Sequence, residues 1–205
     1  MRYPVIFAMA AFASISQANL LSNGSFESGA FVGDAFGDMQ LLGGSTTITG
    51  WTVMGDEIAW VKNGNFDNIT ASDGVMSLDL AGYANSGSQG GVQQSFATVV
   101  NQQYLVSLDL GTFSTAWGNT RITVDAAGQN QSFTEVPNGT QRWDTHTWLF
   151  TANSTTTTLS IFETNPTGSI YNGLDNISVE AVPEPASMVA LGVGVAAMIR
   201  RRRSA

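Results

Sequence analysis

The chain has 205 residues, of which 16 are acidic and 8 are basic, and its formal net charge is −8. It has no cysteine and one histidine, which excludes disulfide bonds, thiolate zinc sites and histidine-rich metal sites. One acidic and five basic residues lie in the terminal segments, so residues 19–181 keep 15 acidic and 3 basic residues and carry a net charge of −12. A domain this acidic suits an exterior protein that could hold divalent cations, and its charge disfavours nucleic-acid binding.

The apolar stretch at the amino terminus is typical of a removable secretion signal over residues 1–18. A Met-Arg start precedes the apolar run Val5–Ile15, and Ser16-Gln17-Ala18 places small residues at the −3 and −1 positions of a cleavage site. The alternative is a buried amino-terminal helix, but this run is too short to span a bilayer. We therefore predict export and leave this segment out of the fold.

Residues 19–181 are expected to form a single all-β domain. Short apolar runs recur about every ten residues between glycine, serine, threonine and asparagine, and no window keeps a helical period for three turns. This pattern is typical of a sandwich or a barrel. The predicted strands are Thr46–Val53, Glu57–Val61, Val75–Leu80, Gly91–Thr98, Gln103–Phe113, Thr120–Ala126, Gln131–Thr134, Trp143–Thr151, Thr156–Glu163 and Leu174–Ala181.

Alternation along the strand 103–113 predicts which of its faces is buried. The alternate residues from Tyr104 to Leu110 are apolar and should belong to the core, whereas Ser107 and Asp109 fall on the opposite face.

Five segments of the domain carry family-specific motifs: Asn19–Glu27, Ile48–Val53, Asp73–Leu80, Val92–Phe96 and Leu174–Val179. Together they resemble the choice-of-anchor C family. That family is similar to plant cell-wall proteins and to carbohydrate-binding modules with a galactose-binding-like jelly roll. The resemblance implies a two-sheet antiparallel β-sandwich whose first and last strands lie together.

The resemblance also implies a possible structural calcium ion, because modules of this shape often hold one where the opening and closing segments meet. Glu27 and Asp175 are the acidic residues of those two segments. Calcium takes about six to eight oxygen ligands, which two segments and loop carbonyls together can supply. The alternative is that both carboxylates only cap turns. Asp34 and Asp38 lie in a glycine-rich loop but lack the spacing of an EF-hand.

Four tryptophans are candidates for sugar contact or core. A sugar ring packs its apolar C–H face on an indole while nearby polar side chains bind its hydroxyls. Trp117 lies in a predicted loop just before Arg121, and Trp143 lies opposite the inferred core face of its strand, so these three residues are predicted to bind the ligand. Trp60 is a fourth predicted ligand residue, although it lies in a strand. Trp51 is expected in the core. The alternative for Trp117 and Trp143 is a half-buried rim aromatic.

Catalytic residues are not expected. Asp144 and His146 share one face of a strand, but the chain has no Gly-x-Ser-x-Gly nucleophile elbow and no phosphate-binding glycine loop. Abundant carboxylates do not show that two of them face each other, as glycoside hydrolysis requires. We predict that the protein is not an enzyme.

In residues 182–205, a Pro-Glu-Pro sequence at 183–185 is followed by the uncharged run Ala186–Ile199 and then by four arginines. The run would reach about 21 Å as a helix, against a hydrocarbon core of about 30 Å, which makes it a marginal span. This order of features resembles the PEP-CTERM sorting tail of certain Gram-negative bacteria. The resemblance implies recognition by an exosortase-type membrane protease after transient insertion of this helix in the inner membrane. The alternatives are an ordinary single-span anchor or a basic nucleic-acid-binding tail. The predicted sorting residues are Pro183, Glu184, Pro185, Arg200, Arg201, Arg202 and Arg203.

These features together predict an exported protein of the cell envelope or extracellular matrix that binds carbohydrate of an exopolysaccharide. Its expected partners are the secretion machinery, the sorting protease and that polysaccharide. The alternatives are a passive structural matrix protein and, less favoured, a glycan-active enzyme. A lectin-like module needs an exposed aromatic in a polar groove, whereas a passive protein needs none.

Overall fold

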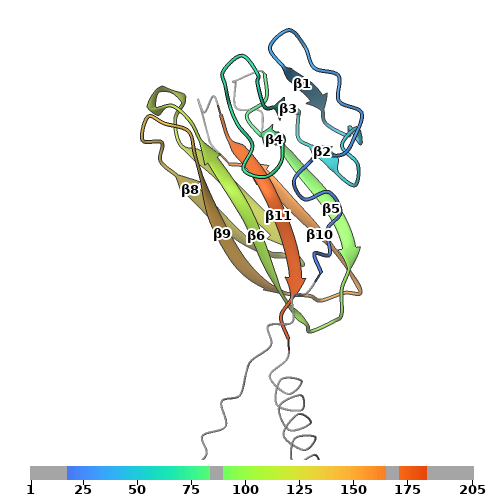
Figure 1. The fold of residues 1–205 in the computed structure, drawn as a ribbon. Coiled ribbons are helices and arrows are strands. Elements are labelled where there is room, and N and C mark those ends of the chain that lie inside the picture. Colours follow the sequence, from blue (N-terminus) through green and yellow to red (C-terminus); the bar gives the residue numbers. More distant parts are fainter. Residues whose placement is uncertain (1–17, 84–89, 165–170, 184–205) are drawn as a thin grey trace, which may run out of the picture. The chain divides into compact units, whose positions relative to one another are not determined.

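The computed structural model describes residues 18–83, 90–164 and 171–183, and residues 19–181 form one compact unit (Figure 1). The described residues form an all-β sandwich with one short 3₁₀ turn, η1 (Thr115–Trp117), and no α-helix. No helix among them is long and apolar enough to cross a membrane. The predicted fold class is therefore confirmed for the domain.

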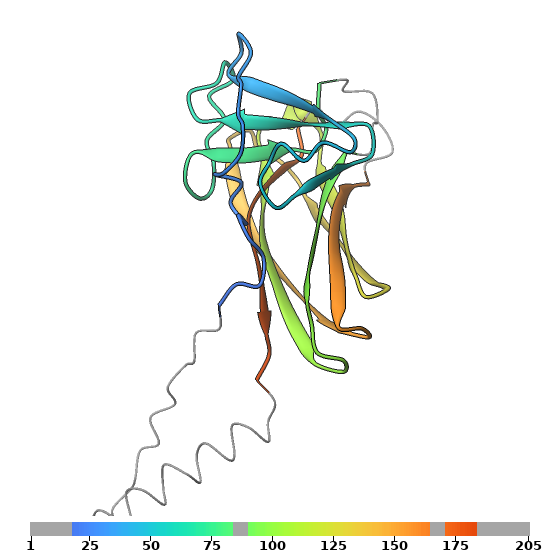
Figure 2. The same ribbon diagram turned by 90° about the vertical axis from the view of Figure 1, so that its right-hand side faces the viewer.

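Eleven strands form two sheets of antiparallel neighbours that pack face to face (Figure 2). The strands β6, β9 and β11 run along the sandwich, whereas β1, β3 and β4 gather at one end of it. The six-stranded sheet has the order β1 (Asp38–Leu42), β3 (Glu57–Lys62), β4 (Met76–Asp79), β11 (Gly173–Ala181), β6 (Gln103–Thr112) and β9 (Arg142–Thr151). The five-stranded sheet has the order β2 (Thr52–Met54), β5 (Gly91–Ala97), β10 (Thr156–Glu163), β7 (Thr120–Ala126) and β8 (Gln129–Glu135).

The core lies between the sheets and follows the alternation of apolar residues. In β6, Tyr104 and Leu110 are 3% and 0% exposed, as predicted. Trp51 is 1% exposed, its ring contacts Phe26 with centroids 5.3 Å apart, and its indole N–H donates to the carbonyl of Asn23 at 2.9 Å. A buried indole needs such a partner, because an unpaired buried N–H would cost free energy.

The predicted strands agree well with the observed ones, with two differences near the amino terminus. The strand β1 was missed because its outward residues are exposed at a sheet edge and give little periodic signal. The predicted strand Thr46–Val53 starts only at Thr52, because the chain turns at Gly50, where φ is +85°. Before that turn, Ile48 forms an isolated bridge with Gly29.

The opening segment lies along β11, as the resemblance implied. The amide of Leu20 donates to the carbonyl of Val179, and the amide of Ile177 donates to the carbonyl of Gly24, both at 2.9 Å. The side chain of Asn19 continues this pairing, since its Oδ1 accepts from the amide of Val179 at 3.0 Å. The two ends of the domain are therefore joined by hydrogen bonds between backbone groups far apart in the chain.

Candidate functional site

The outer face of the six-stranded sheet, opposite the core, collects polar and small residues. Cross-strand partners run in one row from Ala59 through Asp79, Gly173 and Gly111 to Trp143. Their chain neighbours point into the core because side chains alternate along a strand. This row therefore brings residues from β3, β4, β11, β6 and β9 onto one surface.

The connection between β3 and β4, residues 63–75, packs against this face, and we call it the covering loop. The amides of Ser72 and Asp73 donate to Oδ2 of Asp175 in β11, at 2.7 and 2.9 Å. The hydroxyl of Ser72 also donates to Oδ2 of Asp109 in β6. The loop is thus held by carboxylates from two neighbouring strands.

The two carboxylates predicted to bind calcium both hold the end of this loop. Oε1 of Glu27 accepts the amides of Val75 and Met76, each at 2.8 Å. Asp175 accepts a further amide, from Asn176, at 2.7 Å. These contacts fit the turn-capping alternative. The described residues contain no group of three or more acidic or histidine side chains placed to hold a metal, so calcium stays a prediction.

Trp143 supports the far side of the covering loop. Its indole N–H donates to the carbonyl of Thr70 at 2.9 Å, and the side chain of Gln141 binds the same residue. Its ring lies over Gly111, where an added Cβ would come within 2.7 Å of the ring. Trp143 is therefore half-buried and engaged within the fold, as in the rim-aromatic alternative.

Trp117 belongs to an aromatic cluster with Phe113 and Tyr171 on the same outer face. Its ring stacks on Phe113 with centroids 4.6 Å apart and approaches Tyr171 at 6.3 Å. Both Phe113 and Trp117 pack against a small apolar cluster that includes Ile69 of the covering loop. The turn η1 sets this position, because the hydroxyl of Ser114 accepts the amide N–H of Ala116 at the start of the turn.

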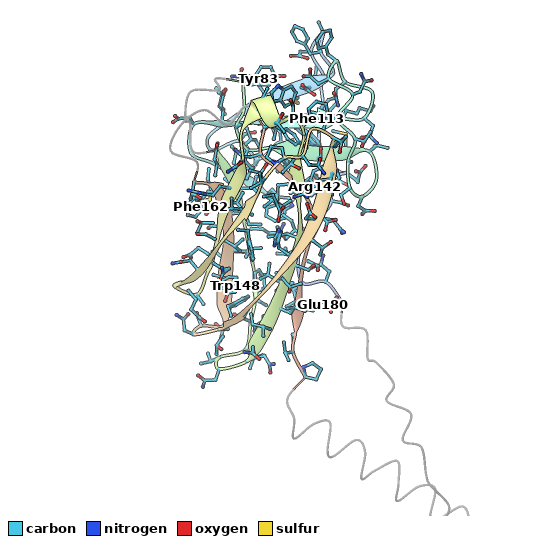
Figure 3. The ribbon with its side chains drawn as sticks, turned by 90° about the vertical axis from the view of Figure 1, so that its left-hand side faces the viewer. Tyr83, Phe113, Arg142, Trp148, Phe162 and Glu180 are labelled. Atoms are coloured by element: carbon cyan, nitrogen blue, oxygen red, sulfur yellow. The ribbon has the colours of Figure 1, made fainter. Side chains whose placement is uncertain are left out.

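A pocket of about 180 Å³ opens beside Trp117. Its apolar wall comes from β3, Ile69 and Trp117, and its polar wall comes from three aspartates and a tyrosine. Figure 3 shows Tyr83 and Phe113 near the same end of the sandwich, with Glu180 toward the other end. The lining residues are Asp38, Ala59, Val61, Asp67, Ile69, Asp79, Gly82, Tyr83 and Trp117.

Burial sets the electrostatics of the pocket. It raises the pKa of Asp79 to about 7, although the amides of Asn172 and Ala81 donate to this carboxylate. It also raises the pKa of Asp38 to about 6, with a further contribution from nearby carboxylates. Burial and a hydrogen bond from its hydroxyl to Asp34, at 2.9 Å, raise the pKa of Tyr83. Charge in this pocket is therefore costly without a partner.

Two predicted ligand residues lie elsewhere. Trp60 is 1% exposed and donates to the carbonyl of Phe26 at 3.2 Å, so its prediction as a ligand residue is wrong and it is a core residue. Arg121 lies in β7, on the outer face of the five-stranded sheet, where its Nε donates to Thr134 at 3.3 Å. The loop between β6 and β7 passes from one sheet to the other, which separates Arg121 from Trp117.

Asp144 and His146 share one strand face, as predicted, and belong to an ion-pair network at the β8–β9 edge. Arg142 binds both Glu135 and Asp144, the latter at 2.9 Å. Nε2 of His146 lies 3.0 Å from the Glu135 carboxylate, and its ring lies 4.6 Å from that of Phe133. Each of these side chains is therefore accounted for by a contact within the network.

Of the predicted sorting residues, only Pro183 is described, and it is exposed. The others lie outside the described residues: Glu184, Pro185, Arg200, Arg201, Arg202 and Arg203.

Sequence reasoning identified Trp117 but missed the acidic side of the pocket. Asp79 offered a signal, since it alternates with the apolar Leu78 and Leu80 in a predicted strand and therefore had to face away from the core. Asp67 and Tyr83 lie in connections and gave no periodic signal.

Two family models match the chain. The family described as "Protein of unknown function (DUF642)" matches residues 19–179, and the PEP-CTERM protein-sorting motif matches residues 181–203. Halomucin of Haloquadratum walsbyi (strain DSM 16790 / HBSQ001) is 31% identical over 188 residues, which cover 89% of this chain. The matched region is 2% of the length of halomucin.

Two solved structures share the fold. TmCBM61 in complex with β-1,4-galactotriose is 16% identical with a TM-score of 0.54, and the match covers 80% of this chain and 99% of that one. The arabinose-bound α-L-arabinofuranosidase MgGH51 is 15% identical with a TM-score of 0.55, covering 80% of this chain and 26% of that one. At these sequence identities, the structural similarity shows a shared β-sandwich fold.

Proposed function

Since this chain belongs to the DUF642 family and carries a PEP-CTERM sorting motif, we propose that it is an exported cell-surface protein whose sandwich binds carbohydrate of the extracellular matrix. The sorting motif supports a surface location. The proposed route starts with a secretion signal over residues 1–18, continues with transient insertion of the tail in the inner membrane and ends with cleavage by an exosortase-type protease.

The pocket beside Trp117 is the observation that carries the binding role. It combines an indole wall with carboxylates and a phenol on one surface, which is what a sugar ring with an apolar face and polar hydroxyls requires. TmCBM61, which is matched along nearly its whole length, is solved with a galactotriose, and this further supports a sugar as the ligand.

A glycan array probed with residues 19–181 tests the binding role. This segment is one compact unit with its own core, so it is suitable as an isolated domain. We expect binding to at least one bacterial exopolysaccharide fragment and a loss of about tenfold or more in affinity for Trp117→Ala, because an aromatic anchor commonly contributes about 2 kcal/mol. Phe162→Ala, on the other sheet, is the aromatic control and should bind as the wild type does (Figure 3).

A passive structural role in the matrix is the second candidate. It is favoured by Trp143, whose indole is engaged by the covering loop and leaves one fewer platform for a ligand. If no glycan binds and Trp117→Ala leaves matrix retention unchanged, the passive role stands and the binding role fails.

The sorting role has a separate test in cells. Replacing Pro183, Glu184 and Pro185 with alanine should leave export intact and retain the uncut protein in the inner membrane, as seen by fractionation and immunoblotting. Normal maturation and relocation of this variant would contradict a role for the motif.

A further inference from the structure

The pocket is surrounded by negative charge. Asp38, Asp67 and Asp79 line it, and Asp34 and Glu57 lie close enough to raise the pKa of Tyr83. No lysine or arginine is among its described lining residues. An anionic ligand would therefore be repelled, and a cationic one attracted.

The three cations of the described domain are placed elsewhere. Arg142 pairs with two carboxylates at the β8–β9 edge, and Arg121 lies on the other sheet. Lys62 is exposed, with its ammonium group 5.9 Å from the centre of the Phe31 ring. No described cation of the chain itself therefore neutralises the pocket.

Asp79 is built into the fold yet retains a free acceptor. It is 8% exposed, and its Oδ1 accepts the amides of Ala81 and Asn172 at 2.9 and 2.8 Å. Both of these hydrogen bonds go to Oδ1, so Oδ2 is the oxygen of this carboxylate that is left for a ligand donor. A carboxylate that is buried and half satisfied costs free energy, which a ligand donor can recover.

Asp38 repeats this feature on the opposite wall, at the edge strand β1. Its Oδ1 is buried and has no hydrogen-bond partner among the described residues. The pocket thus presents the unpaired Oδ1 of Asp38 and the Oδ2 of Asp79, together with the rings of Trp117 and Tyr83. An aromatic face favours both an apolar C–H surface and a nearby cation.

The volume limits the ligand to a small group. About 180 Å³ is below the range of roughly 300–1,000 Å³ that holds a drug-sized molecule. A single sugar residue of a longer glycan meets this limit, with the rest of the chain outside the pocket.

From these observations we infer that the pocket binds a sugar residue that carries a protonated amino group and rejects uronic-acid residues. This inference rests on the proposed carbohydrate-binding function and adds the class of sugar. The ammonium group donates to Asp79 and Asp38, and the ring packs against Trp117.

The same geometry makes binding depend on pH. Asp38 and Asp79 have raised pKa values, about 6 and about 7, because they are buried near each other and near further acidic groups. The groups that face them are Asp34, Asp67 and the phenols of Tyr83 and Tyr171. An ammonium ligand must displace the protons of the two aspartates, so affinity should rise from pH 5 until the ligand's own amine loses its proton.

Calorimetry with three tetrasaccharides tests the inference on residues 19–181 at pH 6, where the glucosamine amines keep most of their protons. We expect a β-1,4-glucosamine tetramer to bind at least tenfold more tightly than its N-acetylated counterpart, and an α-1,4-galacturonic acid tetramer not to bind. Asp79→Asn should weaken binding of the glucosamine tetramer at least tenfold. Asp38→Asn should also weaken binding of this tetramer. The fold should tolerate this substitution better, because no described residue donates a hydrogen bond to the Asp38 carboxylate.

Asp56→Asn is the matched control, since Asp56 is an exposed aspartate outside the pocket. If this variant loses as much affinity as Asp79→Asn, or if the N-acetylated tetramer binds equally well, the inference is overturned while carbohydrate binding stands. If none of the tetramers binds and the array also gives no ligand for the wild type, the proposed function fails as well. Melting curves of each variant verify that the domain is folded.

Discussion

The outward polar side chains of the two sheets find their hydrogen-bond partners in different ways. On the five-stranded sheet, outward hydroxyls pair at the surface, as Ser95 does with Thr158 and Thr123 does with Ser132, both at 2.8 Å. On the six-stranded sheet, outward carboxylates are buried under the covering loop and accept specific donors. An exposed hydroxyl pair can exchange its partner for water, whereas a buried carboxylate cannot. The outer face of the six-stranded sheet therefore has fixed polar contacts that can form a binding site.

The largest expected effect comes from Asp109, which is 5% exposed and accepts from Ser72, Thr145 and Asn176. Asp109→Ala leaves these donors without their acceptor, so we expect a loss of about 3 kcal/mol in the free energy of unfolding, measured by urea denaturation. Thr123→Ala on the other face should change it by less than about 0.5 kcal/mol. Equal losses in the free energy of unfolding for the two variants would contradict the proposed difference between the two outer faces.

A pH titration of stability gives the next largest effect. The folded pKa of Asp79 is about 7, above the ordinary aspartate value of 3.8, so between these two pH values the folded state holds the proton and the unfolded state does not. The resulting stability is fully present below about pH 4 and is lost as the pH rises through about 7, by about 2 kcal/mol between pH 5 and pH 7. Asp79→Asn should flatten this part of the profile of melting temperature against pH. A profile that the substitution leaves unchanged would contradict the burial of this charge.

Trp143→Phe isolates the indole hydrogen bond to the covering loop. The substitution keeps an aromatic ring over Gly111 and removes the donor to Thr70, so we expect a loss of about 1 kcal/mol in the free energy of unfolding. Faster hydrogen exchange in residues 63–75 should accompany it. The control is Phe162→Leu on the five-stranded sheet, which should leave exchange in this loop unchanged.

The smallest expected effect concerns calcium. If a calcium ion binds at Glu27 and Asp175, EDTA should lower the melting temperature, and Glu27→Gln should abolish that response. A ligand specific for the folded state stabilises it by RT ln(1 + [L]/Kd), which is about 0.4 kcal/mol when the free ligand is at its Kd. A melting curve that EDTA does not change would contradict calcium and leave backbone capping as the role of these two residues.

Local features of the chain were predictable because they depend on neighbouring residues. The strands β7 and β10 have the predicted bounds, and alternation assigned the core residues of β6 correctly, because a strand has a fixed side-chain period of two. The edge strand β1 was missed because exposure at an edge weakens that period. The sorting motif was also recognisable, since it is a contiguous pattern of residues.

The site itself was decided by strand order and by the path of the covering loop. Ser72 and Asp175 are 103 residues apart in the chain, yet they share a hydrogen bond across the outer face. Trp117 and Arg121 are close in sequence, but Trp117 lies in the turn η1 and packs on the outer face of the six-stranded sheet, whereas Arg121 lies in the five-stranded sheet. Trp60 is buried because its strand turns that side chain inward. Composition and periodicity predicted an acidic all-β domain, and the resemblances to the choice-of-anchor C family and to the PEP-CTERM tail implied the two-sheet sandwich and its export. Only the tertiary structure decided which of its carboxylates meet at the pocket, because such contacts depend on the pairing of segments that no local pattern encodes.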